Sequence, residues 1–138
     1  MIQLVDDRRL GAILRGGPAP DPDAEVFTTG SWYVRLCQAV LAAASRPGKL
    51  SGPLADLPEP TRSRAIEALL ELPDTIGLVS LRDLGPTIGR LRARHQLNIL
   101  GMEALAAAVH LDAHVYLSSS SPKLEAALVA EDLATTVL

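Results

Sequence analysis

Cysteine and aromatic residues are scarce in this sequence. Of its 138 residues only Cys37 is a cysteine, and Phe, Trp and Tyr together make up 3%. A single thiol excludes an internal disulfide, so a reducing compartment such as the cytoplasm is expected. Cys37 lies close to Leu36, Val40 and Leu41 in a predicted helix, which favours a buried, inert thiol.

Long apolar runs and an excess of positive charge are also missing. No run approaches the length needed to span a membrane, and the opening IQLV followed by DDRR lacks the basic-then-apolar order of a secretory signal. The formal net charge of −3 argues against broad attraction to nucleic acid, although arginines can still cluster locally. We therefore expect a cytoplasmic protein without membrane association, for which RNA is not the favoured partner.

The remaining composition is that of an ordinary globular protein. Hydrophobic residues make up 48% and charged residues 21% of the chain. A chain of this length buries about two-thirds of its unfolded surface as one core. We expect a single domain over residues 1–138, in which the Pro- and Gly-rich residues 46–58 form a surface loop.

Short apolar strands alternate with helices along the chain. The helix around 103–111 has no charged side chain after Glu103 apart from its histidine, so most of its circumference must be covered by protein. The other elements are predicted strands at 2–5, 76–81 and 113–117, and predicted helices at 8–14, 32–44, 61–72 and 84–95, with Ser31 and Thr61 as N-caps. This order predicts an α/β, three-layer sandwich whose central, mostly parallel sheet has four or five strands.

Two segments follow a more specific pattern. IQLVDDRRLGAIL (2–14) is an apolar strand that ends in acids and leads into a helix. RLRARHQLNILGMEALAAAVHLDAHVYLSSSS (90–121) runs from a basic helix through a leucine-containing turn and an alanine-rich helix to an apolar strand. Both resemble the PIN domain family, the small α/β nucleases of many bacterial toxins. The resemblance implies the sandwich fold and, because family members commonly pair, a homodimer.

The resemblance also identifies the positions of a metal site. PIN nucleases gather about four carboxylates at the C-terminal edge of the sheet, where Mg²⁺ or Mn²⁺ activates water for phosphodiester hydrolysis. Asp6 stands at the first acidic position, but Gly101 and Ser119 stand at two others, and Val34 or Arg35 at the fourth. Hard cations require anionic oxygen ligands. The resemblance therefore implies a degenerate site in which Asp6 is a vestigial metal ligand, and no cofactor is expected.

An active, rearranged site is the alternative. Asp7 adjoins Asp6, and Glu103 lies two residues beyond Gly101, so these three acids are the candidate catalytic residues of a Mg²⁺- or Mn²⁺-dependent endoribonuclease. Two positions turn a helical side chain by about 200°, so Glu103 must shift by a turn to reach the site. The structural interpretations are that the two aspartates cap the helix beginning at Arg8, and that Glu103 is an acid at a helix start.

Candidate binding residues fall in two places. Trp32 and Tyr33, with Arg35 nearby, are residue types that dominate binding interfaces, although Trp32 is equally suited to the core. Ser118 and Ser119 begin a hydroxyl-rich turn at the predicted edge of the sheet, where phosphates commonly bind.

Three functions follow from these observations. The leading hypothesis is a catalytically degenerate PIN-like domain that acts as an interaction or regulatory module, with a protein partner or a second copy of itself. The alternatives are a toxin-like PIN ribonuclease with a rearranged acidic site, and a phosphate- or nucleotide-binding regulatory domain that uses the serine turn.

Overall fold

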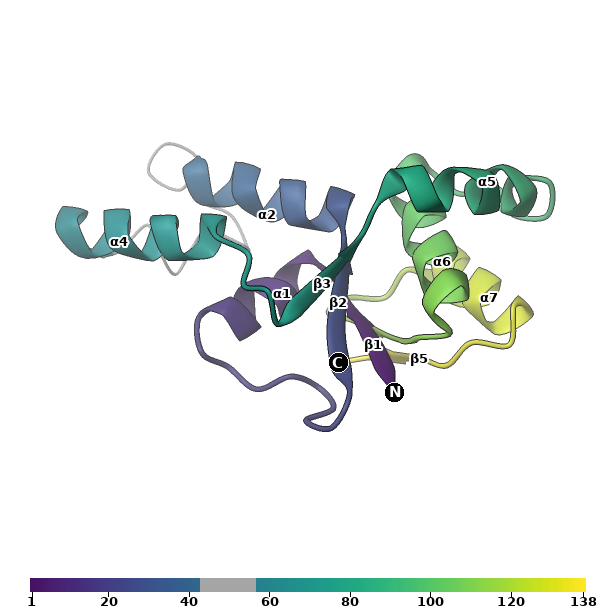
Figure 1. Ribbon diagram of the computed structural model, residues 1–138, viewed down its shortest axis with the longest axis horizontal. Coiled ribbons are helices and arrows are strands. Elements are labelled where there is room, and N and C mark those ends of the chain that lie inside the picture. The colour runs from purple at the N-terminus through teal and green to yellow at the C-terminus, as the bar shows by residue number, and fades with distance from the viewer. Residues whose placement is uncertain (43–56) are drawn as a thin grey trace.

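A sheet of five parallel strands organises the protein. The computed structural model describes residues 1–42 and 57–138, and within them the strand order is β3-β2-β1-β4-β5 (Figure 1). The strands are β1 (Ile2–Val5), β2 (Glu25–Thr29), β3 (Ile76–Val79), β4 (His114–Leu117) and β5 (Thr135–Val137). Every pairing is parallel. The predicted α/β sandwich with four or five mostly parallel strands is confirmed.

Helices cover both faces of this sheet. In Figure 1, α1, α2 and α4 lie on one side of the strands and α5, α6 and α7 on the other. Their bounds are α1 (Asp7–Leu14), α2 (Gly30–Leu41), α4 (Glu59–Leu70), α5 (Leu81–Arg92), α6 (Ile99–Leu111) and α7 (Pro122–Ala130). Among the helices of the described ranges, none is long and apolar enough to cross a membrane. The predicted loop at 46–58 lies outside the described residues, except for its last two positions.

The core is divided by the sheet into two clusters. In the larger cluster α6 contributes an unbroken run of buried residues, 102–108, which packs against Leu4 of β1 and Val115 of β4. α6 is covered by protein on nearly all sides, and this burial explains why the stretch after Glu103 is apolar. The smaller cluster joins Val5 to Leu10, Leu36 and Leu69 on the other face.

Several predicted helix starts are wrong. α5 begins at Leu81 rather than at 84, because the Ser80 hydroxyl accepts a hydrogen bond from the Arg82 amide, so the strand before it ends at Val79 rather than at 81. α2 begins at Gly30, where the Thr29 hydroxyl accepts a hydrogen bond from the Trp32 amide at 3.1 Å, so Thr29 rather than Ser31 is the N-cap. α4 begins at Glu59 rather than after Thr61, because Pro58 and Pro60 both supply the backbone angle that a first turn needs. The β2 strand thus runs directly into α2, and the side chain of Ser31 is free for another role.

The strand order creates a crevice at one edge of the sheet. From β1 the chain moves to β2 and β3 on one side, and later to β4 and β5 on the other. Loops that leave β1 and β4 at their C-terminal ends therefore diverge, and ligands of open α/β sheets bind at such a point. Asp6 follows β1 and Ser118 follows β4, so both flank this crevice.

A close approach between β2 and β3 gives a stability prediction. Gly77 pairs with Phe27, and a Cβ atom on Gly77 would lie within 3.0 Å of three ring carbons of Phe27. Gly77→Ala should therefore lower the free energy of unfolding by about 1–3 kcal/mol through overpacking. Gly85→Ala is the matched control, since Gly85 is helical with open space around it and should gain up to about 1 kcal/mol. Urea unfolding followed by circular dichroism measures both, and equal effects would contradict the packing argument.

Candidate functional site

A cavity of about 300 Å³ occupies the crevice between β1 and β4. Asp6, Arg35, Gly101 and Ser119 all line it, although they come from four separate parts of the chain. These are the positions at which the resemblance places a metal site, and Arg35 rather than Val34 is the residue that reaches it. The structure therefore brings the four predicted positions together, with one carboxylate among them.

Asp6 is fully engaged by protein donors. Its side chain is buried, and Oδ1 accepts hydrogen bonds from the Arg9 amide at 2.9 Å and the Ser118 hydroxyl at 2.9 Å. Oδ2 accepts the Ser118 amide at 2.6 Å. Asp6 is thus the N-cap of α1, as the structural interpretation predicted, and it also fastens the loop after β4 to β1.

Asp7 faces an arginine instead of a cation site. Its Oδ1 accepts the Arg8 amide at 2.8 Å, whereas Oδ2 is buried without a hydrogen bond and lies 3.4 Å from Arg35 Nε. Burial raises the pKa of Asp7, and the Arg35 charge partly offsets that rise. The Arg35 side chain is 54% exposed, so the pair stands at the mouth of the cavity. A guanidinium therefore sits beside the acids where the resemblance predicts another carboxylate.

The remaining two positions bring no anionic group. Gly101 lies in the first turn of α6, and its amide donates to the Asn98 side chain at 2.8 Å. Ser119 is exposed at the cavity rim. Within the part of the chain that the structure describes, no group of three or more His, Cys, Asp or Glu side chains is placed to hold a metal ion. Among the residues that the structure describes, Asp6 and Asp7 are the acids that line this cavity.

Glu103 lies elsewhere. It is 1% exposed, its Oε2 accepts the Ser31 hydroxyl at 2.7 Å, and its Oε1 accepts the Ser31 amide at 3.1 Å. It is absent from the lining of the cavity that Asp6 and Asp7 share. The interpretation of Glu103 as a helix-start acid is wrong, because α6 begins four residues earlier, at Ile99. Its carboxylate instead joins α6 to the start of α2.

The aromatic pair splits between two roles. Trp32 is 4% exposed and belongs to the larger core cluster, yet one side of it also lines the cavity. The Tyr33 hydroxyl donates to the Leu70 carbonyl and so joins α2 to α4 within the smaller cluster. Trp32 and Arg35 are therefore brought to the predicted site, and Tyr33 is not.

Several hydrogen-bond donors of the serine turn, residues 118–121, bind carboxylates of the protein itself. The Ser118 amide and hydroxyl bind Asp6, while the Ser120 hydroxyl and the Ser121 amide donate to Glu125 Oε2 at 3.0 and 2.7 Å. Pro122 occupies the first position of α7, where a proline is well tolerated. Ser118, the first of the two predicted binding residues, is therefore committed to Asp6, which weakens the prediction of a phosphate site there.

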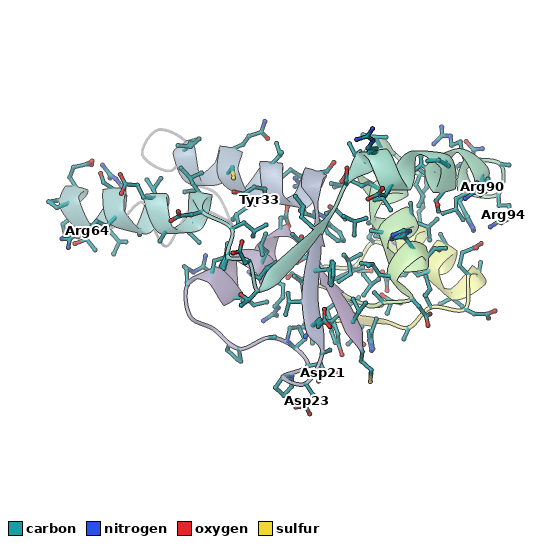
Figure 2. The ribbon with its side chains drawn as sticks, viewed as in Figure 1. Asp21, Asp23, Tyr33, Arg64, Arg90 and Arg94 are labelled. Carbon is teal, nitrogen blue, oxygen red and sulfur yellow. The ribbon has the colours of Figure 1, made fainter. Side chains whose placement is uncertain are left out.

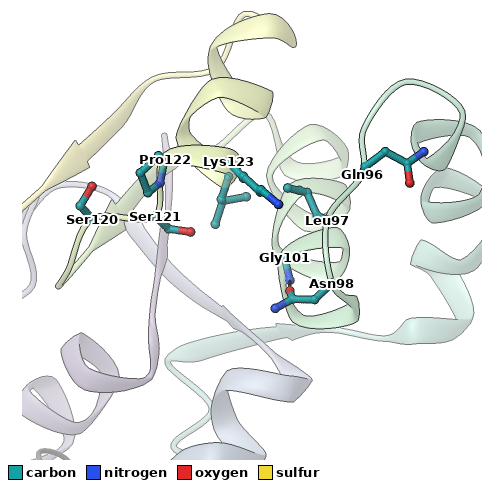
Figure 3. Close-up of a pocket in the computed structure, with 9 residues that line it drawn as sticks. Gln96, Leu97, Asn98, Gly101, Ser120, Ser121, Pro122 and Lys123 are labelled. Carbon is teal, nitrogen blue, oxygen red and sulfur yellow. Dashed lines mark hydrogen bonds between the residues drawn. The ribbon is translucent and has the colours of Figure 1, made fainter.

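A second cavity, of about 570 Å³, adjoins the first. It shares Asn98, Gly101 and Ser120 with it and extends between the starts of α6 and α7, past Gln96 and Lys123 (Figure 3). The sequence prediction omitted Asn98, Ser120 and Lys123. Only Asn98 carried a usable signal, since an asparagine directly before an apolar helical run is a typical N-cap.

The Asp7–Arg35 pair predicts a pH-dependent effect. With its pKa raised, Asp7 is protonated in the folded protein at pH 3 and does not then pair with Arg35. Arg35→Gln should raise the pKa of Asp7 further and lower the free energy of unfolding at pH 7 by at most about 1 kcal/mol, with little effect at pH 3. Carboxyl NMR titration and urea unfolding at both pH values measure this. In an Asp7→Asn background the pH dependence should vanish, and an equal loss at both pH values would refute the pairing.

No protein-family model matches the sequence, and no curated protein matches it. The likeness to PIN domains therefore stays a prediction that rests on the residue pattern. The structure brings Asp6, Arg35, Gly101 and Ser119 to one cavity.

Proposed function

We propose that this chain is a PIN-like domain that has lost metal-dependent nuclease chemistry and acts by binding. The observation that carries the proposal is the cavity between β1 and β4, where a glycine, a serine and an arginine accompany Asp6. A cavity in the position of an active site, without the charge needed for the reaction, supports a binding role over a catalytic one.

Electrostatics in the cavity argue against a bound divalent cation. Mg²⁺ and Mn²⁺ require several anionic or carbonyl oxygens directed at one point. Both oxygens of Asp6 already accept hydrogen bonds from the protein, and Asp7 lies next to the Arg35 guanidinium. A metal ion would have to compete with these donors for the Asp6 oxygens and approach a like charge at Arg35, and both are unfavourable.

The rearranged ribonuclease receives less support. It needs Glu103 to leave a buried position in which it accepts hydrogen bonds from Ser31, and that departure would leave the Ser31 amide and hydroxyl unpaired. The serine-turn phosphate site is likewise weakened, because its donors bind Asp6 and Glu125. Neither alternative is favoured by a specific contact.

Metal titration tests the loss of the cation site. Up to 1 mM Mn²⁺ should leave the melting temperature of the native chain within about 1 °C, since linkage requires a bound ligand. The triple variant Arg35→Glu, Gly101→Asp, Ser119→Asp should regain a site. If 1 mM Mn²⁺ is about 100 times the Kd of the new site, metal binding should raise the free energy of unfolding by about 2.7 kcal/mol and the melting temperature by about 8 °C.

Asp6→Asn provides the control for this titration. Added to the triple variant it should abolish the metal response, while in the native chain it should lower stability regardless of metal, because Asp6 caps α1. A native chain that Mn²⁺ stabilises, or that cleaves RNA until Asp6 is replaced, would overturn the proposal.

The partner of such a module is expected to be protein. The resemblance implies that copies of the chain pair, so light scattering should give the mass of a homodimer. A concentration of about 100 μM is needed to populate the dimer if its interface is weak. A monomer at that concentration would remove the support for self-association and leave a different protein as the proposed partner.

A further inference from the structure

An arginine-lined cavity of about 430 Å³ lies beside α1, separate from the two cavities described above. Arg8, Arg9 and Arg15 line it together with Ala12, Ser118 and Leu138. Within residues 1–42 and 57–138, no aspartate or glutamate side chain is part of its lining. In a chain whose formal net charge is −3, three guanidinium groups at one cavity form a local region of opposite sign.

The helix places these side chains on one face. Positions 8, 12 and 15 are spaced by four and three residues, which brings them to one side of a helix, and Arg9 is adjacent. Arg9 Nε is buried and has no hydrogen-bond partner. Among the described residues, none of these three arginines takes part in an ion pair within 4.0 Å. A buried guanidinium N–H without an acceptor is unfavourable unless a ligand supplies one.

Helix stability does not explain this arrangement. Arg8 and Arg9 lie in the first turn of α1, where the helix dipole disfavours positive charge. The nearby acids do not compensate through contacts with these side chains, because Asp6 binds Ser118 and Asp7 faces Arg35. Arginines that the helix dipole disfavours, and that have no structural partner, are expected at positions where function requires them.

We propose that this cavity binds a phosphate group, carried by a small phosphorylated molecule or by an RNA backbone. A phosphate monoester carries between one and two negative charges at neutral pH, and guanidinium groups bind its oxygens through pairs of parallel hydrogen bonds. Arg9 supplies the buried donor, and Arg8 and Arg15 flank the opening. Ser118 donates to Asp6, so it fixes the wall of the cavity rather than the ligand. This proposal is independent of whether the β1–β4 cavity holds metal.

Calorimetric titration with inorganic pyrophosphate, and separately with an oligouridylate, tests this site. Arg9→Gln should weaken binding of pyrophosphate about tenfold or more, as expected for loss of a charge-assisted hydrogen bond. The double variant Arg8→Gln, Arg15→Gln changes exposed side chains and should weaken binding without disturbing the fold, which circular dichroism verifies. Arg64→Gln on α4 (Figure 2) is the matched control for Arg9→Gln, since each of these variants removes one positive charge.

The two ligands distinguish the sources of the phosphate. If RNA is the source, the oligouridylate binds more tightly than pyrophosphate and its affinity falls steeply with added salt. If the source is a small molecule, pyrophosphate binds at least as tightly as the oligouridylate. Failure of both ligands to bind, an equal loss in Arg64→Gln, or binding of succinate as tight as that of pyrophosphate would overturn the phosphate site.

Discussion

The hydrogen bonds of the Asp6 carboxylate join β1, α1 and the loop after β4, and the crevice at the edge of the sheet depends on them. Asp6 caps α1, and its two oxygens bind the amide and hydroxyl of Ser118, so the ends of β1 and β4 are joined where the strand order reverses. Hydrogen bonds to a charged, buried acceptor are among the stronger ones in proteins. Asp6 therefore links the two sides of the crevice, and this structural role competes with the metal-binding role that the resemblance implies for it.

Arg35 determines the electrostatic character of the crevice. Its guanidinium lies against Asp7, whose burial alone would favour the neutral acid. A carboxylate in that position would instead add to the negative charge and favour a cation. Together with Gly101 and Ser119, this arginine leaves the crevice with fewer anionic oxygens than a divalent cation requires.

Much of the fold and part of the site could be predicted from the sequence. Alternating apolar strands and helices, and the uncharged stretch of α6, depend on local periodicity, which a single sequence displays directly. Positions 6, 101 and 119 could be predicted from the resemblance, which left Val34 and Arg35 as alternatives for the fourth position. The contact of Glu103 with Ser31 could not, since the two are 72 residues apart and only the packing of α6 against the start of α2 brings them together. The helix start at Gly30 was missed because Thr29 competes with Ser31 as a cap, and the start at Glu59 because Pro58 and Pro60 compete with Thr61 as start signals.

Charge on α1 is divided between two environments. The acids at its start, Asp6 and Asp7, are directed to the crevice, whereas Arg8, Arg9 and Arg15 line a cavity of their own. Because Asp6 and Asp7 have protein partners, the wall of the crevice is supported although positions 35, 101 and 119 carry no carboxylate. A phosphate group bound beside α1, as proposed above, would occupy a cavity separate from the crevice. The proposed phosphate binding is therefore independent of any metal chemistry in the crevice.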